Sequence, residues 1–141
     1  YKFPIDKIQL TNAILANNLN LKKIIRIVHL EVRNRMQSFL KKNKHKKFII
    51  LDIPLLLENK LNKKKDILVY VQSSKKNILR NLKKRNNFNA RLVNKFKKIQ
   101  LPLAYKKNSS RFIIKNNFTK KSVKDGIKRI LKIIKNDRNS S

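Results

Sequence analysis

Apolar side chains recur at helical spacing through the first third of the chain. Residues 6–20 carry a stripe of five, namely Ile8, Leu10, Ile14, Leu15 and Leu19. From Leu21 to about Lys42 a denser stripe advances mostly by three and four residues, through Leu21, Ile24, Ile25, Val28, Val32, Met36, Phe39 and Leu40. Such steps place apolar side chains on one face of a helix. Two helices are therefore predicted, followed by the polar connector "KKNKHKK" at 41–47.

Continuous apolar runs replace this spacing at three places further along. The stretch "FIILDI" (Phe48–Ile53) is followed by Pro54, which cannot donate to a strand ladder and therefore ends the run. The runs "DILVYVQ" (Asp66–Gln72) and "RFIIKN" (Arg111–Asn116) have the same character. Because such runs are typical of strands covered on both faces, three buried strands are predicted.

Helices are predicted between and after these strands. Ser73 and Ser74 offer an N-cap after the second strand, Asn89 can cap a short basic helix running towards Gln100, and Thr119 can cap a final helix. Strands that alternate with helices predict an α/β domain with a largely parallel sheet. Three strands are few for such a sheet, and the chain does not begin with Met, so we expect that N-terminal elements are missing.

The charge of the chain invites a nucleic-acid interpretation. Its 141 residues include 38 Lys and Arg against 7 Asp and Glu, a net charge of +31. Such a charge attracts polyanions, and a basic nucleic-acid-binding module is one hypothesis. The excess is mostly Lys, accompanied by many Asn and Ile. An A/T-rich coding sequence supplies these residues to any fold, so charge alone does not decide the function, and only non-specific nucleic-acid binding is expected.

The composition also limits metal sites and location. The chain has no Cys, which excludes disulfides and thiolate metal sites. Two His and a few scattered acids argue against a structural zinc or calcium site, and no protein metal site is expected. No apolar run approaches the roughly 18 residues of a membrane span, and no signal-peptide core is present. A soluble cytoplasmic protein without a membrane partner is therefore expected, and its oligomeric state is not indicated.

The glycine count restricts nucleotide binding. Gly126 is the only glycine in the sequence. Phosphate-binding loops of the form GxxxxGK[ST] or GxGxxG cannot be written with one glycine. If the protein is a nucleotide enzyme, its phosphate loop lies outside these residues.

One acid stands out in the first predicted strand. Asp52 lies close to the carboxyl end of "FIILDI", and ligands of parallel sheets bind beyond the carboxyl ends of the strands. A carboxylate there could orient magnesium-bound water or a phosphate-binding lysine. It could equally accept hydrogen bonds from a neighbouring loop, and the spacing leaves both interpretations open.

Four blocks of sequence carry a family resemblance. "ILDIPLLLE" (Ile50–Glu58) resembles a motif of the dephospho-coenzyme A kinase family of P-loop kinases. "IVHLEVR" (Ile27–Arg33) resembles the motif IVHPxVR of the same family. "DILVYVQSS" resembles the strand that leads into the family's lid helix, with Arg85 where the lid arginine is expected. "QLPLAYKKNSSRFIIKNN" (Gln100–Asn117) resembles QxPxxxKxxxADxVIxNxG. The resemblance implies a P-loop kinase-like parallel sheet flanked by helices with a helical lid, its first strand and phosphate loop absent from this chain.

The resemblance also implies an activity and a set of site residues. The activity is transfer of the γ-phosphoryl of ATP, with Mg²⁺, to the ribose 3′-hydroxyl of dephospho-CoA, the last step of coenzyme A biosynthesis. Asp52 and Arg85 are implied as catalytic residues. Arg85 and Asn116 are implied to bind ATP, with Arg85 at the transferring phosphates and Asn116 near the adenine. The implied acceptor-binding residues are His29, Arg33, Glu58, Gln100 and Lys106. Without a phosphate loop, these 141 residues alone are expected to be inactive.

A domain division follows from the same resemblance. One kinase-like domain is expected over 1–136, with an acceptor-side helical region at 21–47 and a lid with its following helix at 74–108. Residues 137–141 are expected to form a frayed tail.

Departures from the family pattern keep alternatives open. Leu30 replaces a proline, Ser110–Arg111 replaces Ala-Asp, and Ile25 stands where a glutamate is expected. Arg85 and Lys106 could simply belong to a solvated basic surface, and His29 could be a helix-packing residue. Asn116 could be only a turn former, and Glu58 could stabilise the end of a loop. Another P-loop nucleoside or nucleotide kinase is a further alternative.

Overall fold

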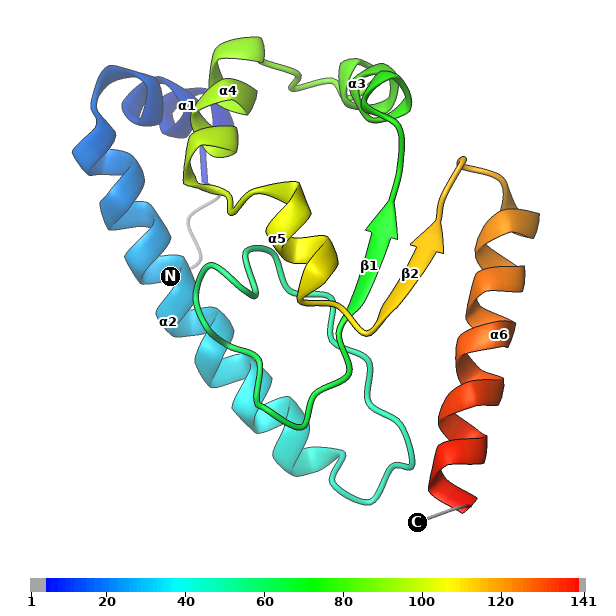
Figure 1. Ribbon diagram of the computed structural model, residues 1–141. Coiled ribbons are helices and arrows are strands. Elements are labelled where there is room, and N and C mark those ends of the chain that lie inside the picture. The colour runs from blue at the N-terminus through cyan, green and yellow to red at the C-terminus, as the bar shows by residue number, and fades with distance from the viewer. Residues whose placement is uncertain (1–4, 140–141) are drawn as a thin grey trace. The chain divides into compact units, whose positions relative to one another are not determined.

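The computed structural model describes residues 5–139, which form six helices and two strands. In chain order the elements are α1 (Lys7–Ala16), α2 (Asn18–Lys42), β1 (Val69–Gln72), α3 (Lys75–Lys83), α4 (Ala90–Ile99), α5 (Leu103–Asn108), β2 (Phe112–Lys115) and α6 (Lys120–Asn139) (Figure 1). They divide into two compact units. The first comprises residues up to 62 together with 89–100, and the second comprises 63–88 and the residues from 101 onward.

The first unit begins with the two predicted helices, and the boundary between them lies at Asn17. Asp6 caps α1 by accepting hydrogen bonds from the backbone N–H groups of Ile8 at 2.8 Å and Gln9 at 3.2 Å. Asn17 has an extended backbone with φ −146°, and its side chain accepts from the N–H of Leu19 at 2.8 Å. An asparagine at this position satisfies an otherwise unpaired N–H group of α2. The first helix was expected over 6–20, but α1 ends at Ala16 and residues 18–20 belong to α2.

The packing of the first unit joins α4 to the end of α1. Ile14, Leu21 and Leu61 are its buried apolar side chains among the described residues. Lys95 of α4 donates from Nζ to the carbonyl oxygens of Ile14 at 2.7 Å and Leu15 at 3.1 Å. The last carbonyls of a helix have no partner within it and carry partial negative charge, so an ammonium group stabilises them. One of the many lysines thus has a defined structural function.

The second unit is built on a parallel pair of strands. β1 and β2 pair in register from Val69 opposite Phe112 to Gln72 opposite Lys115. α6 packs on β2, and Ile114 of β2 is 7% exposed. The predicted α/β class, with parallel strands flanked by helices, is confirmed.

The strand predicted at Phe48–Ile53 is wrong. This segment has no regular secondary structure, and Ile50 is 88% exposed. An apolar run becomes a strand only where a neighbouring strand completes its ladder. Among the described residues, strand pairing joins only β1 and β2. The two other predicted strands exist but are shorter than expected, at Val69–Gln72 and Phe112–Lys115.

Burial of β1 also differs from the prediction. Val69 is 40% exposed and Val71 55% exposed. The expectation of strands covered on both faces is therefore wrong for β1. A continuous apolar sequence shows that both faces of a strand can be buried. Whether they are buried depends on which other elements cover the strand.

The predicted helix caps are confirmed. The side chains of Ser74, Asn89 and Thr119 accept hydrogen bonds from backbone N–H groups three residues further on, at 3.2, 2.9 and 3.3 Å. α5 was not predicted. At the other end of the chain, α6 extends through Asn139, Asp137 pairs with Arg111, and residues 140–141 of the expected tail lie outside the described residues.

Gly126 lies inside α6, where the helix meets β2. A methyl group at this position would stand 3.0 Å from Cγ2 and 3.4 Å from Cγ1 of Ile114. The missing side chain therefore permits the close approach of α6 to the sheet. This explains a glycine in a helix interior, where it costs about 1 kcal/mol relative to alanine.

Substitution of Gly126 is expected to depend on Ile114. Gly126→Ala should lower the free energy of unfolding, because overpacking of about 1–3 kcal/mol exceeds the gain in helix propensity of about 1 kcal/mol. In an Ile114→Ala background the new methyl group has room, so the same substitution should be stabilising. Urea unfolding of the four proteins measures the difference as a coupling energy of at least about 1 kcal/mol. An equal effect of Gly126→Ala in both backgrounds would contradict this packing.

Candidate functional site

The predicted site residues are shared between the two units. The first unit contains His29, Arg33, Asp52, Glu58 and Gln100. The second contains Arg85, Lys106 and Asn116. Each group is described within its own unit.

In the first unit, α2 and the turn at 54–60 are joined through His29. Its ring is half-buried, and Nε2 lies 3.1 Å from Nδ2 of Asn59. Arg33 is exposed one helical turn further along α2. Glu58, the neighbour of Asn59, is half-buried. The His29–Asn59 contact therefore brings the turn that carries Glu58 against the helix that carries His29 and Arg33.

This turn has an unusual backbone. Leu55 has φ 57° and Lys60 has φ 50°, a left-handed conformation that residues other than glycine rarely adopt. The turn is closed by hydrogen bonds from the N–H of Asn59 to the carbonyl of Leu55 at 3.1 Å and from Leu61 to Leu56 at 3.0 Å. Leu61 is buried. Several contacts therefore hold a strained backbone next to His29, and such strain is found disproportionately at functional sites.

Asp52 and Gln100 occupy more open positions. Asp52 does not end a strand, because 48–53 pairs with no other described segment. Its carboxylate is exposed and accepts no hydrogen bond from another described residue. Gln100 is the C-cap of α4, where its N–H donates to the carbonyl of Lys97 at 3.3 Å, and it is also exposed.

In the second unit, Asn116 directly follows β2, whereas the predicted strand at Arg111–Asn116 included it as the last residue. Its N–H donates to the carbonyl of Gln72 at 2.8 Å, and its own carbonyl accepts from Oγ of Ser73 at 2.5 Å. Its Oδ1 accepts from the N–H of Phe118 at 2.7 Å. The carboxyl ends of β1 and β2 thus meet at Asn116, which is the edge where parallel sheets bind ligands.

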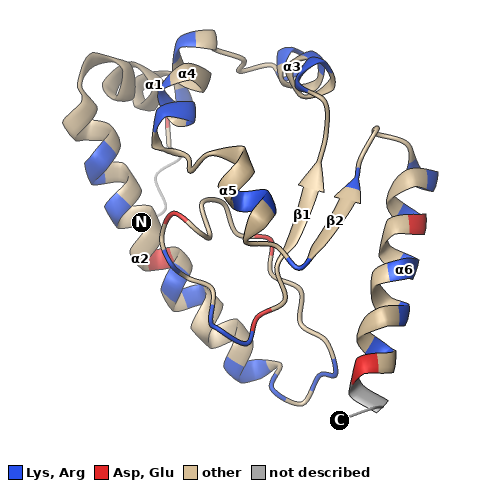
Figure 2. Cartoon of the chain, in the orientation of Figure 1, with Lys and Arg blue, Asp and Glu red and all other residues tan. Residues whose placement is uncertain are grey.

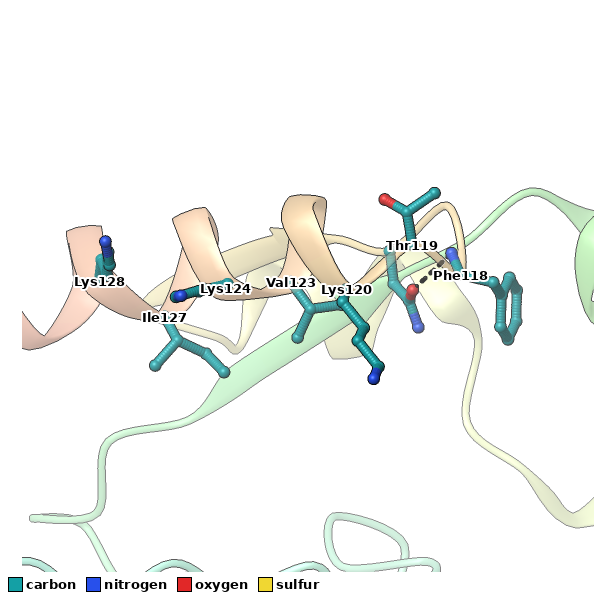
Figure 3. A pocket seen from close by; sticks show the side chains of 8 residues that line it. Phe118, Thr119, Lys120, Val123, Lys124, Ile127 and Lys128 are labelled. Atoms are coloured by element: carbon teal, nitrogen blue, oxygen red, sulfur yellow. Dashed lines mark hydrogen bonds between the residues drawn. The ribbon is translucent and has the colours of Figure 1, made fainter.

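An open pocket of about 530 Å³ lies beside Asn116, along the first turns of α6 (Figure 3). Phe118 has φ 67° and a side chain that is 47% exposed. The other lining residues are Thr119, Val123 and Ile127, with Lys120, Lys124 and Lys128 at four-residue steps. Apolar surface beside an aromatic ring can accept a flat ring, and the neighbouring row of ammonium groups can attract a negatively charged group attached to that ring.

Arg85 lies in the turn that follows α3. Its N–H donates to the carbonyl of Leu82 at 3.1 Å, and its carbonyl accepts from the N–H of Phe88 at 3.0 Å. The residue is exposed, so the backbone is fixed while the guanidinium faces solvent. Lys106 lies on α5, is half-buried, and accepts a hydrogen bond at its carbonyl from Oγ of Ser110 at 2.9 Å.

Basic side chains are spread over the chain and do not gather on one element. Figure 2 shows Lys and Arg on helices of both units, and the sequence places at least one on each of α1–α6. Over residues 5–139, no cluster of three or more His, Asp or Glu side chains could hold a metal ion. Within the same range, no helix combines the length and apolarity that a membrane crossing requires.

Sequence reasoning missed the contacts of three polar residues. Asn59 contacts His29, Ser73 binds the carbonyl of Asn116, and Oδ1 of Asn117 accepts from the Thr119 N–H at 3.0 Å. An Asn-Asn pair before a helix cap is a local signal that could have identified Asn117. Asn59 lies 30 residues from His29, so no local pattern indicates that contact.

Residues 4–122 match the family model for dephospho-CoA kinase. The chain belongs to the dephospho-CoA kinase family. Curated members similar to it include the dephospho-CoA kinases of Wolbachia sp. subsp. Brugia malayi, 30% identical over 129 residues, and of Wolbachia pipientis wMel, 32% identical over 129 residues. Each alignment covers 90% of this chain and 66% of the relative. The dephospho-CoA kinase of Bacillus thuringiensis is 30% identical over 132 residues, covering 91% of this chain and 65% of the relative. The chain thus spans about two thirds of the length of these relatives.

Proposed function

We propose that the protein acts as an ATP-dependent dephospho-CoA kinase, phosphorylating the ribose 3′-hydroxyl of dephospho-CoA. The observation that carries the proposal is the family match over residues 4–122, which includes segments of both units. The 141 residues alone are proposed to be inactive, because Gly126 is their only glycine and lies inside α6.

Residues of the first unit are proposed to contact the acceptor. His29 and Arg33 present an imidazole and a guanidinium from α2, and Glu58 lies on the turn held against His29. Gln100 of the first unit and Lys106 of the second are each proposed, from the family resemblance, to contact the acceptor. Guanidinium and ammonium groups suit the phosphates of dephospho-CoA, because charge-assisted hydrogen bonds to phosphate are strong.

ATP would bind through Arg85 and Asn116. The pocket beside Asn116 supports this proposal, because Phe118, Val123 and Ile127 offer apolar surface to an adenine ring. The exposed guanidinium of Arg85 can bridge phosphate oxygens and neutralise charge during phosphoryl transfer. The chemistry asked of these residues is positioning and charge stabilisation.

Mg²⁺ fits this proposal with a single protein carboxylate. The ion is commonly held by one or two carboxylates together with substrate phosphates and water. Asp52 offers an exposed carboxylate that no described residue engages. When bound, the ion would neutralise charge on the phosphates. Asp52 would then hold metal-bound water or a phosphate-binding lysine in position.

Binding of dephospho-CoA should differ from binding of RNA. We expect isothermal titration of the 141-residue chain with dephospho-CoA to give an affinity that survives raised salt. Mixed-sequence RNA should dissociate as the salt concentration rises, because the release of its counterions on binding then contributes less free energy. Arg33→Ala should weaken dephospho-CoA binding by about 10- to 150-fold, since a charge-assisted contact contributes about 1.5–3 kcal/mol and about 1.4 kcal/mol corresponds to a factor of ten.

Arg35→Ala is the matched control for this experiment. Arg35 lies on the same helix and pairs with Glu31 at 2.6 Å, and its loss removes the same charge. Both variants should weaken RNA binding equally, and only Arg33→Ala should weaken dephospho-CoA binding. Retention of RNA at high salt without dephospho-CoA binding would favour the nucleic-acid-binding alternative.

A further inference from the structure

The contact between His29 and Asn59 indicates which nitrogen of the His29 imidazole carries the proton. Nδ2 of Asn59 makes two contacts, to the carbonyl oxygen of Leu55 at 2.7 Å and to Nε2 of His29 at 3.1 Å. A backbone carbonyl can only accept a hydrogen bond. The side-chain atom of Asn59 that faces Leu55 must therefore be the amino nitrogen, a donor.

The same nitrogen faces His29, which determines the role of the ring. The amino group of Asn59 has two hydrogens, so it can donate to Leu55 and to His29 together. Nε2 of His29 must then accept, and in a neutral imidazole the proton is placed on Nδ1. An imidazolium has no acceptor nitrogen, so this contact fits the neutral ring alone.

We propose that Asn59 is a positioning residue that holds His29 as the neutral Nδ1–H tautomer. The remaining ring nitrogen is then a hydrogen-bond donor, and Nδ1 has no hydrogen-bond partner among the described residues. On the proposed function, the group that Nδ1–H contacts is an acceptor oxygen of dephospho-CoA, from its ribose or its phosphates. His29 thus contributes a directed neutral donor, whereas Arg33 contributes charge.

The geometry of the turn supports this assignment. Asn59 is half-buried, and its backbone N–H also donates to Leu55 at 3.1 Å. The carbonyl of Leu55 is therefore fixed by two hydrogen bonds from one residue, and Leu55 itself has φ 57°. The unusual conformation of Leu55 presents the carbonyl that orients the Asn59 amide.

The tautomer can be read directly by NMR, without substrate. Long-range ¹H–¹⁵N correlation of the two imidazole rings, recorded at a pH that keeps histidines neutral, should show the Nδ1–H pattern for His29. His45 is an internal control, because it is exposed in the turn after α2 and has no described hydrogen-bond partner. An unrestrained imidazole prefers the Nε2–H tautomer, so His45 should show the opposite pattern. An Nε2–H pattern at His29 in the native chain would overturn the proposal.

Two substitutions of similar shape test the role of Asn59. Asn59→Asp presents only acceptor oxygens to the ring, so His29 should switch to Nε2–H. Asn59→Leu removes both donor and acceptor, so His29 should return to the preference of His45. Unchanged His45 signals and backbone amide spectra would show that both variants fold. A His29 pattern that does not change in the folded variants would overturn the role of Asn59.

Titration then separates this inference from the proposed function. Dephospho-CoA, adenosine and inorganic phosphate are added separately while the Nδ1 resonance of His29 is followed. A shift with adenosine assigns the contact to the nucleoside, and a shift with phosphate assigns it to a phosphate oxygen. A native Nδ1–H pattern without a shift for any of the three would leave Asn59 as the positioning residue and would overturn the contact with dephospho-CoA.

Discussion

Formation of CoA from ATP and dephospho-CoA is expected to be undetectable with residues 1–141 alone, and to appear when a phosphate-binding segment is joined ahead of Tyr1. Phosphoryl transfer depends on backbone N–H groups of a glycine-rich loop that surround the phosphates. Gly126, the single glycine, lies inside α6 against Ile114 and cannot contribute to such a loop. The joined segment would consist of a strand and a GxxxxGK[ST] loop, and CoA would be measured by chromatography.

A loop variant and a substrate panel make this experiment specific. Replacement of the lysine in the added loop by alanine should abolish the activity that the segment provides. Nucleosides and nucleotides offered in place of dephospho-CoA test the alternative of another P-loop kinase, and phosphorylation of one of them in preference would favour it. CoA formation by residues 1–141 alone would contradict the need for the loop.

Local features of the fold could be predicted from the sequence, because their causes are local. Ser74, Asn89 and Thr119 cap helices through hydrogen bonds to residues three positions away. Such contacts depend on side-chain chemistry and short-range geometry. The two helices of the first 42 residues follow in the same way from apolar spacing, and only the position of the break between them differs, at Asn17 instead of after residue 20.

Features that depend on distant residues could not be predicted in this way. Phe48–Ile53 has the composition of a buried strand, but a strand also needs a neighbour, and composition does not identify one. The sequence shows that Gly126 is rare, whereas only the position of Ile114 explains why it is there.

In the candidate site, too, local features could be predicted from the sequence and contacts between distant residues could not. The local apolar run predicted a strand that ends at Asn116, and the structure ends this strand one residue earlier, at Lys115. The contact that fixes His29 comes from Asn59, 30 residues away. The residue roles themselves stay predictions from the family resemblance, because a role depends on where the substrate lies.

Arg85→Ala is expected to lower the kcat of the extended, active protein by about 10³-fold, because an arginine at the transferring phosphates contributes on this scale. Arg85 is exposed in the turn after α3, and its backbone is fixed by hydrogen bonds to Leu82 and Phe88. Its guanidinium can contact two oxygens at once. Arg85→Lys should restore only part of the rate, because an ammonium group does not reproduce this planar geometry. Steady-state kinetics with varied ATP and dephospho-CoA would measure kcat and KM for each variant.

Arg80→Ala provides the matched control, because Arg80 is also an exposed arginine and lies on α3, five residues before Arg85. Both substitutions remove one positive charge from the same region, so a general effect of charge on nucleotide binding should appear in both. We expect Arg80→Ala to change the kcat by no more than a few-fold. A loss confined to the KM for ATP in Arg85→Ala would mean that the arginine binds the ground state only. Equal losses in both variants would contradict a specific role and would favour the solvated basic surface as the explanation for Arg85.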